Sequence, residues 1–205
     1  MLRITANIAS KIKKAKVLLL GCSAGGFNII YDLLTSLTTS FPLAVVVVIH
    51  RSRNHKSGLE ELLAKKGNLP VKSGAHGLKM ERGMIYIAPP DFHLLLEPHG
   101  DFALDYSEPV YYCRPAIDVT FESVADVHKE NVIAILFSGA NEDGAEGLYY
   151  AKRQGALTVV QDPECAQVKT MPEAAIRMTK THLVLKDDEI FKLMHHIVTL
   201  NNIHE

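Results

Sequence analysis

Continuous apolar stretches and segments of helical periodicity alternate along the first part of the chain. Residues 17–20 and 44–49 are uninterrupted apolar runs rich in Val and Leu, which is typical of strands buried on both faces of a parallel sheet. Between them, apolar side chains recur at helical spacing, namely Phe27, Ile30, Tyr31, Leu34 and Leu37. This pattern predicts a strand–helix–strand unit with a right-handed crossover. Residues 58–66 predict a short helix closed by Gly67.

The pattern changes over residues 69–106. Two short apolar runs, 85–88 and 93–97, flank a Pro-Pro-Asp turn, and a second turn cluster follows at 98–101. Turn residues between short apolar runs predict an antiparallel hairpin or meander inserted between α/β units.

The rest of the chain returns to the α/β pattern. Apolar runs at 132–137 and 157–160 predict two more buried strands, and the remaining periodic segments predict helices at 117–125, 145–154, 172–178 and 189–200. Residues 1–15 are predicted to be a short lead-in to the first strand. We therefore expect one domain over residues 1–205: a mainly parallel, doubly wound sheet with helices on both faces and an antiparallel β-hairpin insert.

Composition narrows the classes of protein to consider. Of 205 residues, 47% are hydrophobic and 22% charged, and the formal net charge is −1, so disorder and a general attraction to nucleic acid are not expected. Three widely spaced cysteines argue against a disulfide framework. No apolar run approaches the roughly 18 residues of a membrane span, and the run after the N-terminal lysines is too short for a signal peptide. A cytoplasmic protein without direct membrane insertion is expected.

Three polar residues follow predicted strands, at Ser23, His50 and Asp143. In an open α/β sheet, ligands bind at the carboxyl ends of the strands. A hydroxyl, an imidazole and a carboxylate at one such edge predict a nucleophile, its base and the residue that orients the base.

Ser23 lies in a G-x-S-x-G motif between a predicted strand and a helix, a pattern that presents a nucleophile on a sharp turn. Two other interpretations remain open at this stage. The same glycine-rich turn could hold a phosphate or a nucleotide, and Ser23 could simply be a helix N-cap.

His50 and Asp143 also have structural alternatives. His50 could be a hydrogen-bonded histidine at a strand end, and Asp143 could be the N-cap of the next helix, with Glu142 as the acid instead. His93 could line the cleft. The chain order Ser–His–Asp differs from that of α/β-hydrolases, but triads are defined by geometry rather than by order.

Several ordered motifs resemble the catalytic domain of the chemotaxis receptor methylesterase family, CheB. The resemblance runs from about Val17 to Met178. The matching segments are LGCSAGG at 20–26, VIH at 48–50, IYIAP at 85–89 with His93-Leu94, RPAIDV at 114–119, LFSGANEDGAEG at 136–147, QDP at 161–163 and MPEAAI at 171–176.

The resemblance implies hydrolysis of glutamate methyl esters on cytoplasmic helices of chemoreceptors, with glutamine deamidation as a further activity. Ser23 would be the nucleophile, His50 the base and Asp143 the orienting acid. Backbone N–H groups near Ala24 and Ala140 would hold the oxyanion. No metal or organic cofactor is implied. The alternative is a non-catalytic phosphate-binding or receptor-docking domain that uses the glycine loop.

The chain departs from the family pattern at three places near the site. Ala24 stands where Thr is common, Ala140-Asn141 where Met-Gly is common, and Arg51-Ser52 where Met-Pro is common. Arg51, Arg53 and Arg114 are candidates for contacts with an acidic receptor surface, or are a solvated rim. Familiar members also carry an N-terminal receiver domain, which we do not expect here, so a regulatory partner is conceivable.

Overall fold

Seven parallel strands form the central sheet of the computed structural model, which describes residues 2–51 and 58–201. Their order across the sheet is β3-β4-β2-β1-β7-β8-β9, and every neighbouring pair is parallel. The strands are β1 (Val17–Cys22), β2 (Ala44–Ile49), β3 (Val71–Ser73), β4 (Ile85–Ile87), β7 (Val132–Leu136), β8 (Leu157–Gln161) and β9 (Leu183–Leu185).

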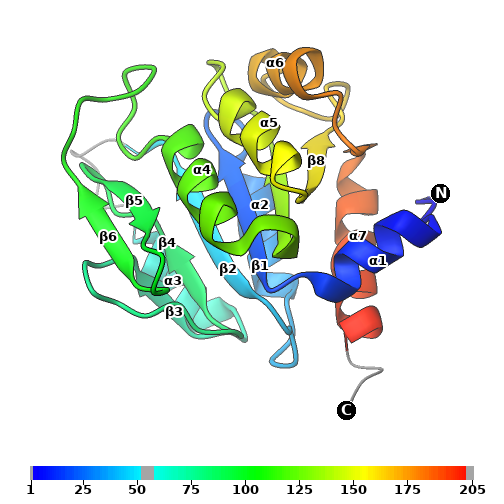
Figure 1. The fold of residues 1–205 in the computed structure, drawn as a ribbon, viewed down its shortest axis with the longest axis horizontal. Helices are drawn as coiled ribbons and strands as arrows, with labels where there is room; N and C mark the ends of the chain where they lie inside the picture. Colours follow the sequence, from blue (N-terminus) through cyan, green and yellow to red (C-terminus); the bar gives the residue numbers. More distant parts are fainter. Residues whose placement is uncertain (1, 52–57, 202–205) are drawn as a thin grey trace.

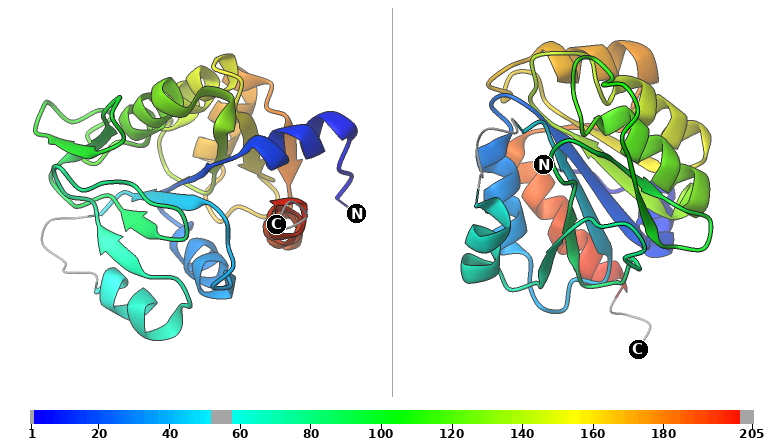
Figure 2. Two further views of the ribbon diagram at one scale, coloured as in Figure 1. Left: turned by 60° about the horizontal axis from the view of Figure 1, so that its bottom comes forward. Right: turned by 90° about the vertical axis from the view of Figure 1, so that its left-hand side faces the viewer.

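Helices cover both faces of this sheet, as predicted (Figure 1). Alternate residues of β1 point to opposite cores: Leu18 and Leu20 join one cluster, and Val17 and Leu19 join the other. The first core packs against α2 (Phe27–Ser36), α3 (Leu59–Lys66) and α7 (Asp187–Asn201). The second packs against α4 (Ile117–His128), α5 (Ala145–Arg153) and α6 (Thr170–Thr179). Figure 2 shows the two layers of helices with the sheet between them.

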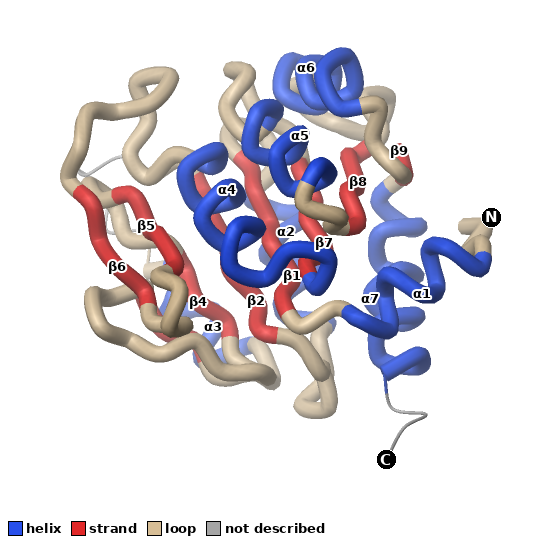
Figure 3. Tube along the Cα trace, viewed as in Figure 1, coloured by secondary structure: helices blue, strands red, loops and turns tan. Residues whose placement is uncertain are grey.

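The predicted hairpin exists, but its strands differ from the expected ones (Figure 3). The segment at 85–88 was expected to pair with 93–97. Instead, β4 joins the parallel sheet between β2 and β3, where all its residues are buried. The hairpin consists of β5 (His93–Leu96) and β6 (Phe102–Asp105). A strand that is apolar on both faces is stabilised best inside a covered parallel sheet, which explains the difference.

Residues 1–15 were expected to be a short lead-in to the first strand without a helix of their own. In the structure, part of this segment forms helix α1 (Ala6–Lys14). Thr5 caps its first turn by accepting from the Ile8 N–H, and Ile8 and Ile12 bury one face against α7. The helix is only nine residues long and buries just these two apolar side chains, so the apolar pattern that marks it in the sequence is short.

Other boundaries differ from the predictions by one to three residues. The short strands β3 and β9 had no predicted counterpart, and a 3-10 turn at Lys129–Asn131 joins α4 to β7. Within residues 2–51 and 58–201, no helix is both long enough and apolar enough to cross a membrane.

Candidate active site

The carboxyl ends of β2, β1 and β7 lie side by side because these strands are neighbours in the sheet. Cys22 pairs with Ile49 in the parallel register, so the next residue of each strand, Ser23 and His50, are also neighbours. The His50 N–H donates to the Cys22 carbonyl at 3.2 Å. The Ser23 N–H donates to the carbonyl of Ser138, which follows β7, at 2.9 Å. Three distant segments are thus joined at one edge.

The imidazole of His50 and the carboxylate of Asp143 are in direct contact, with Nε2 and Oδ2 2.7 Å apart. Asp143 is fully buried. Its oxygens also accept from the N–H groups of Ile117 at 2.7 Å and Asp118 at 2.9 Å, at the start of α4. Its buried negative charge is therefore stabilised by a helix N-terminus as well as by His50.

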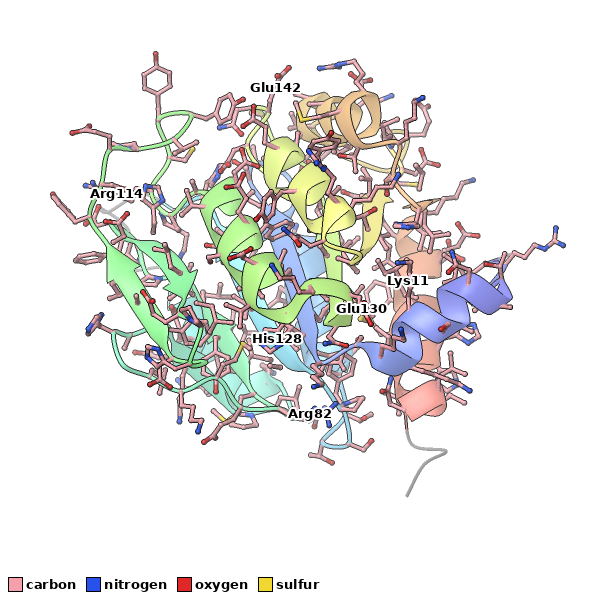
Figure 4. All side chains as sticks on the ribbon, in the orientation of Figure 1. Lys11, Arg82, Arg114, His128, Glu130 and Glu142 are labelled. Carbon is pink, nitrogen blue, oxygen red and sulfur yellow. The ribbon has the colours of Figure 1, made fainter. Side chains whose placement is uncertain are left out.

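Neither alternative for the acid fits this geometry. The N-cap of α5 is Gly144, with a positive φ of 95° and no side-chain cap, so Asp143 does not cap that helix. Glu142 is exposed at the edge of the molecule (Figure 4) and pairs with Arg177 at 3.0 Å. The carboxylate in contact with His50 is that of Asp143.

The environment of His50 favours its charged form. Burial lowers its pKa, but hydrogen bonds with Asp143 and Cys113, together with the negative charge of Asp143, outweigh burial and raise the pKa to about 9. When the imidazole is neutral, Nε2 carries the proton donated to Asp143 and Nδ1 carries the lone pair. Nδ1 lies 3.2 Å from the Cys113 sulfur.

Ser23 is half buried on the turn between β1 and α2. It is not the N-cap of α2, a position that Gly26 occupies. Among the described residues its hydroxyl makes no hydrogen bond, so the structure brings Ser23 next to His50 through the backbone but does not join their side chains. Ala24 and Ala140 are both exposed, and within the described chain neither N–H donates a hydrogen bond.

Sequence reasoning missed the side chain that holds the turn carrying Ser23. The hydroxyl of Ser138, which is buried, donates to the Ala24 carbonyl at 2.8 Å and accepts from the Val168 N–H at 2.9 Å. The Ser138 N–H donates to the side chain of Gln161 at 2.9 Å. Ser138 lies within the segment LFSGANEDGAEG at 136–147, but nothing in the sequence distinguishes it from an ordinary loop serine.

Asp118 was also missed as part of the site. Its Oδ1 accepts from the N–H groups of Gly144 and Gly147, each at 2.7 Å, while its buried Oδ2 has no hydrogen-bond partner among the described residues. Burial, and then the negative charge of Asp143, raise its pKa to about 7. The site therefore contains a second buried carboxyl group, that of Asp118, close to Asp143.

Two of the three candidate arginines, Arg51 and Arg114, lie among the described residues and differ in their contacts. Arg51 is almost fully engaged: its guanidinium contacts Glu60 through two hydrogen bonds and donates to the Ala88 carbonyl. Arg114 lies at the edge of the molecule (Figure 4), stacks 3.8 Å above the Tyr106 ring and donates to two carbonyls. Arg53 and Ser52 lie outside the described residues.

His93 does not line the cleft, contrary to the sequence-based possibility. It is fully buried, accepts from the Ala116 N–H at Nδ1 and contacts the Glu108 carbonyl through Nε2. It therefore holds the loop that carries Cys113 and Arg114 against the body of the protein.

A cavity of about 330 Å³ opens beside His50. Its lining is His50, Arg51, Asp91, Pro109, Tyr112, Cys113 and Arg114. Ser23 is outside this lining. No group of three metal-ligating side chains gathers within the part of the chain that the structure describes.

Comparison with known proteins adds an independent line of evidence. The family model described as CheB methylesterase matches residues 18–194. A Leptospira interrogans protein is 36% identical over 178 residues, which are 87% of this chain and 92% of that protein. A Symbiobacterium thermophilum protein named protein-glutamate methylesterase/protein-glutamine glutaminase is 31% identical; the match covers 83% of this chain and 47% of the relative.

A solved structure agrees with the fold. The crystal structure of the Thermotoga maritima CheB methylesterase catalytic domain superposes with a TM-score of 0.83 at 31% identity, covering 91% of this chain and 98% of that one. Sequence and structure together lead to one conclusion: the chain belongs to the CheB methylesterase family.

Proposed function

We propose that this protein is a serine hydrolase that removes methyl esters from glutamate side chains on the cytoplasmic helices of chemoreceptors. The observation that carries the proposal is the 2.7 Å contact between His50 and buried Asp143, one strand away from Ser23. Family membership supplies the reaction class, and the relatives' names supply the substrate class.

In the proposed mechanism, Ser23 attacks the ester carbonyl while Nδ1 of His50, the ring nitrogen that does not contact Asp143, takes its proton. Asp143 fixes the tautomer and stabilises the imidazolium. His50 then gives the proton to the departing methoxide, which leaves as methanol. Water attacks the acyl-enzyme in the same way and restores Ser23. The Ser23 hydroxyl makes no hydrogen bond with His50 among the described residues, and catalytic hydrogen bonds of this kind often form fully only in the complex with substrate.

We assign stabilisation of the oxyanion to the backbone N–H groups of Ala24 and Ala140. Both residues are exposed, and neither N–H donates a hydrogen bond within the described chain. One good donor of this kind contributes about 10²–10³ in rate. Glutamine deamidation would use the same residues with ammonia as the leaving group. Arg114 is the better candidate for an acidic receptor surface, since Glu60 already compensates the charge of Arg51.

The direct test is methanol release from methylated receptor fragments. Ser23→Ala is expected to lose nearly all turnover while keeping its fold. Ser73→Ala, on the exposed edge strand β3, is the matched control and should retain wild-type turnover. Undiminished turnover in Ser23→Ala would exclude Ser23 as the nucleophile.

The non-catalytic alternatives predict other outcomes. A nucleotide- or phosphate-binding domain would gain thermal stability from a nucleotide and would resist labelling by a fluorophosphonate. A docking scaffold would bind receptor fragments without releasing methanol.

A further inference from the structure

Cys113 has surroundings unlike those of the other cysteines. Its sulfur lies 3.2 Å from His50 Nδ1 and 3.4 Å from Asn141 Nδ2. A nitrogen that can take the thiol proton and an amide N–H that can stabilise negative charge therefore converge on one sulfur atom.

The hydrogen bond between His50 and Asp143 determines which ring nitrogen faces the sulfur of Cys113. Because the Nε2 proton is donated to Asp143, Nδ1 is the nitrogen that faces Cys113: it carries the lone pair when the imidazole is neutral, and it donates an N–H to the sulfur when the imidazole is charged. The order Cys113–His50–Asp143 is that of a nucleophile, a base and an orienting acid. In the structure, the hydroxyl of Ser23 does not hold that position; the sulfur of Cys113 does.

The sulfur is also accessible. Cys113 is only partly buried and lines the 330 Å³ cavity together with Arg51 and Arg114. A water molecule occupies about 30 Å³ in the liquid, so the cavity has room for a small polar reagent beside the sulfur.

We propose that Cys113 is a second nucleophile at this site and is a site of oxidation by hydroperoxides. His50 Nδ1 takes the thiol proton as the sulfur attacks one peroxide oxygen. The S–O bond forms, the O–O bond breaks, and the leaving oxygen takes the proton from His50. With hydrogen peroxide the products are a sulfenic acid on Cys113 and water; sulfur is oxidised and peroxide is reduced.

The modification has a consequence for the esterase, and this part rests on the proposed function. A sulfenic hydroxyl next to His50 would donate to Nδ1 and occupy the lone pair that Ser23 needs. Oxidation would therefore stop ester hydrolysis, and a thiol reductant would restore it, because sulfenic acids are reversible.

The chain offers two internal controls. Cys165 is exposed, and its sulfur makes no hydrogen bond within the described residues. Cys22 is fully buried, and burial raises the pKa of its thiol far above the ordinary value. Exposure alone predicts that Cys165 reacts first, whereas activation by His50 predicts that Cys113 does.

The chemical test treats the reduced full chain with hydrogen peroxide in the presence of dimedone and quantifies each cysteine peptide by mass spectrometry. We expect Cys113 to be labelled at least about tenfold faster than Cys165, since general-base assistance contributes about 10²–10⁴. His50→Gln should remove this advantage without changing the rate at Cys165.

A second variant covers the case in which His50→Gln fails to fold. Asn141→Ala removes the amide N–H that donates to the sulfur, and one hydrogen bond of about 1 kcal/mol corresponds to roughly a fivefold slower reaction at Cys113. Labelling of Cys113 no faster than that of Cys165, or equal rates in wild type and both variants, would overturn the proposal.

The functional test compares turnover before and after peroxide, each protein against its own untreated rate. Wild type should lose methanol release and regain it with dithiothreitol, while Cys113→Ala should keep its untreated rate. Rapid labelling of Cys113 in a protein with no esterase turnover would refute only the proposed function. Turnover with no preferential labelling would refute only the role of Cys113.

Discussion

At the scale of single residues, Asp143 sets the protonation of His50. The proposed base must be neutral, and its pKa of about 9 means that kcat/KM should rise with pH from 7 to about 9 and then level off. Asp143→Asn removes the carboxylate. It should therefore lower the pKa of His50 and, with it, the pH at which kcat/KM levels off. Turnover should fall by about 10³–10⁴, the scale known for the same change in other serine hydrolases.

Glu142→Gln is the matched control, because Glu142 is the adjacent carboxylate but is exposed and bound to Arg177. It should leave both turnover and the pH profile close to wild type. The pH profile of kcat/KM for the three proteins is the measurement. Equal effects of the two substitutions, or an unshifted profile in Asp143→Asn, would contradict the assignment.

Residues at strand ends, and the pairing of His50 with Asp143, could be predicted from the sequence, but the loop residues that contact them could not. Ser23, His50 and Asp143 follow apolar runs, and the parallel topology then brings them to one edge. Cys113 and Ser138 reach the site from loops whose course depends on tertiary contacts. No local pattern indicates such a course, so their contacts with His50 and Ala24 appear only in three dimensions.

At the scale of elements, the turn between β1 and α2 depends on Gly25. This residue has a φ of +78°, and a Cβ placed on it would lie 2.6 Å from the Gln167 Cβ and 2.8 Å from the Ser138 Oγ. Gly25→Ala should therefore displace the turn, disturb the Ser138 bridge and lower kcat by about tenfold or more, equivalent to about 1.4 kcal/mol.

Gly77→Ala separates backbone strain from crowding. Gly77 has a similar φ of +74°, but no atom lies within 4 Å of its added Cβ. It should cost about 1–2 kcal/mol for the left-handed backbone alone and leave kcat unchanged. Thermal unfolding and turnover of both variants check this: a kcat in Gly25→Ala equal to that in Gly77→Ala would show that the turn tolerates the displacement.

The elements most accurately predicted were those with long patterns. The strand–helix–strand unit at β1, α2 and β2 has a strong apolar signal and was confirmed to within two residues at each boundary. The hairpin was assigned to the wrong pair of strands because periodicity cannot distinguish a buried parallel strand from one arm of a hairpin. Helix α1 was missed because tertiary packing, rather than a long amphipathic pattern, stabilises it.

At the scale of the whole molecule, two carboxyl groups join the start of α4 to the start of α5. Asp143 accepts from N–H groups of α4, and Asp118 accepts from those of Gly144 and Gly147. With a pKa of about 7, Asp118 holds a proton in the folded protein that the unfolded chain releases near pH 4. Stability should therefore fall as pH rises from about 4 to 7, because the folded state binds more protons over that range.

Asp118→Asn should abolish this dependence, since an amide oxygen still accepts from both glycines and carries no charge. Relative to wild type, the variant should gain stability between pH 5 and pH 8, by at most about 4 kcal/mol, because the pKa is raised by about three units and each unit corresponds to about 1.36 kcal/mol. Asp126→Asn, on the exposed side of α4, is the control. Hydrogen bonds from Lys129 and Tyr150 lower the pKa of Asp126, so the effect of pH on its contribution to stability has the opposite sign. Urea unfolding at several pH values measures all three proteins.

The contrary outcome is a free energy of unfolding that changes with pH in the same way in wild type and in Asp118→Asn. That outcome would mean that Asp118 is ionised throughout the pH range. The two helix starts would then be joined by a pair of buried negative charges, which the two N-termini and His50 alone would have to stabilise.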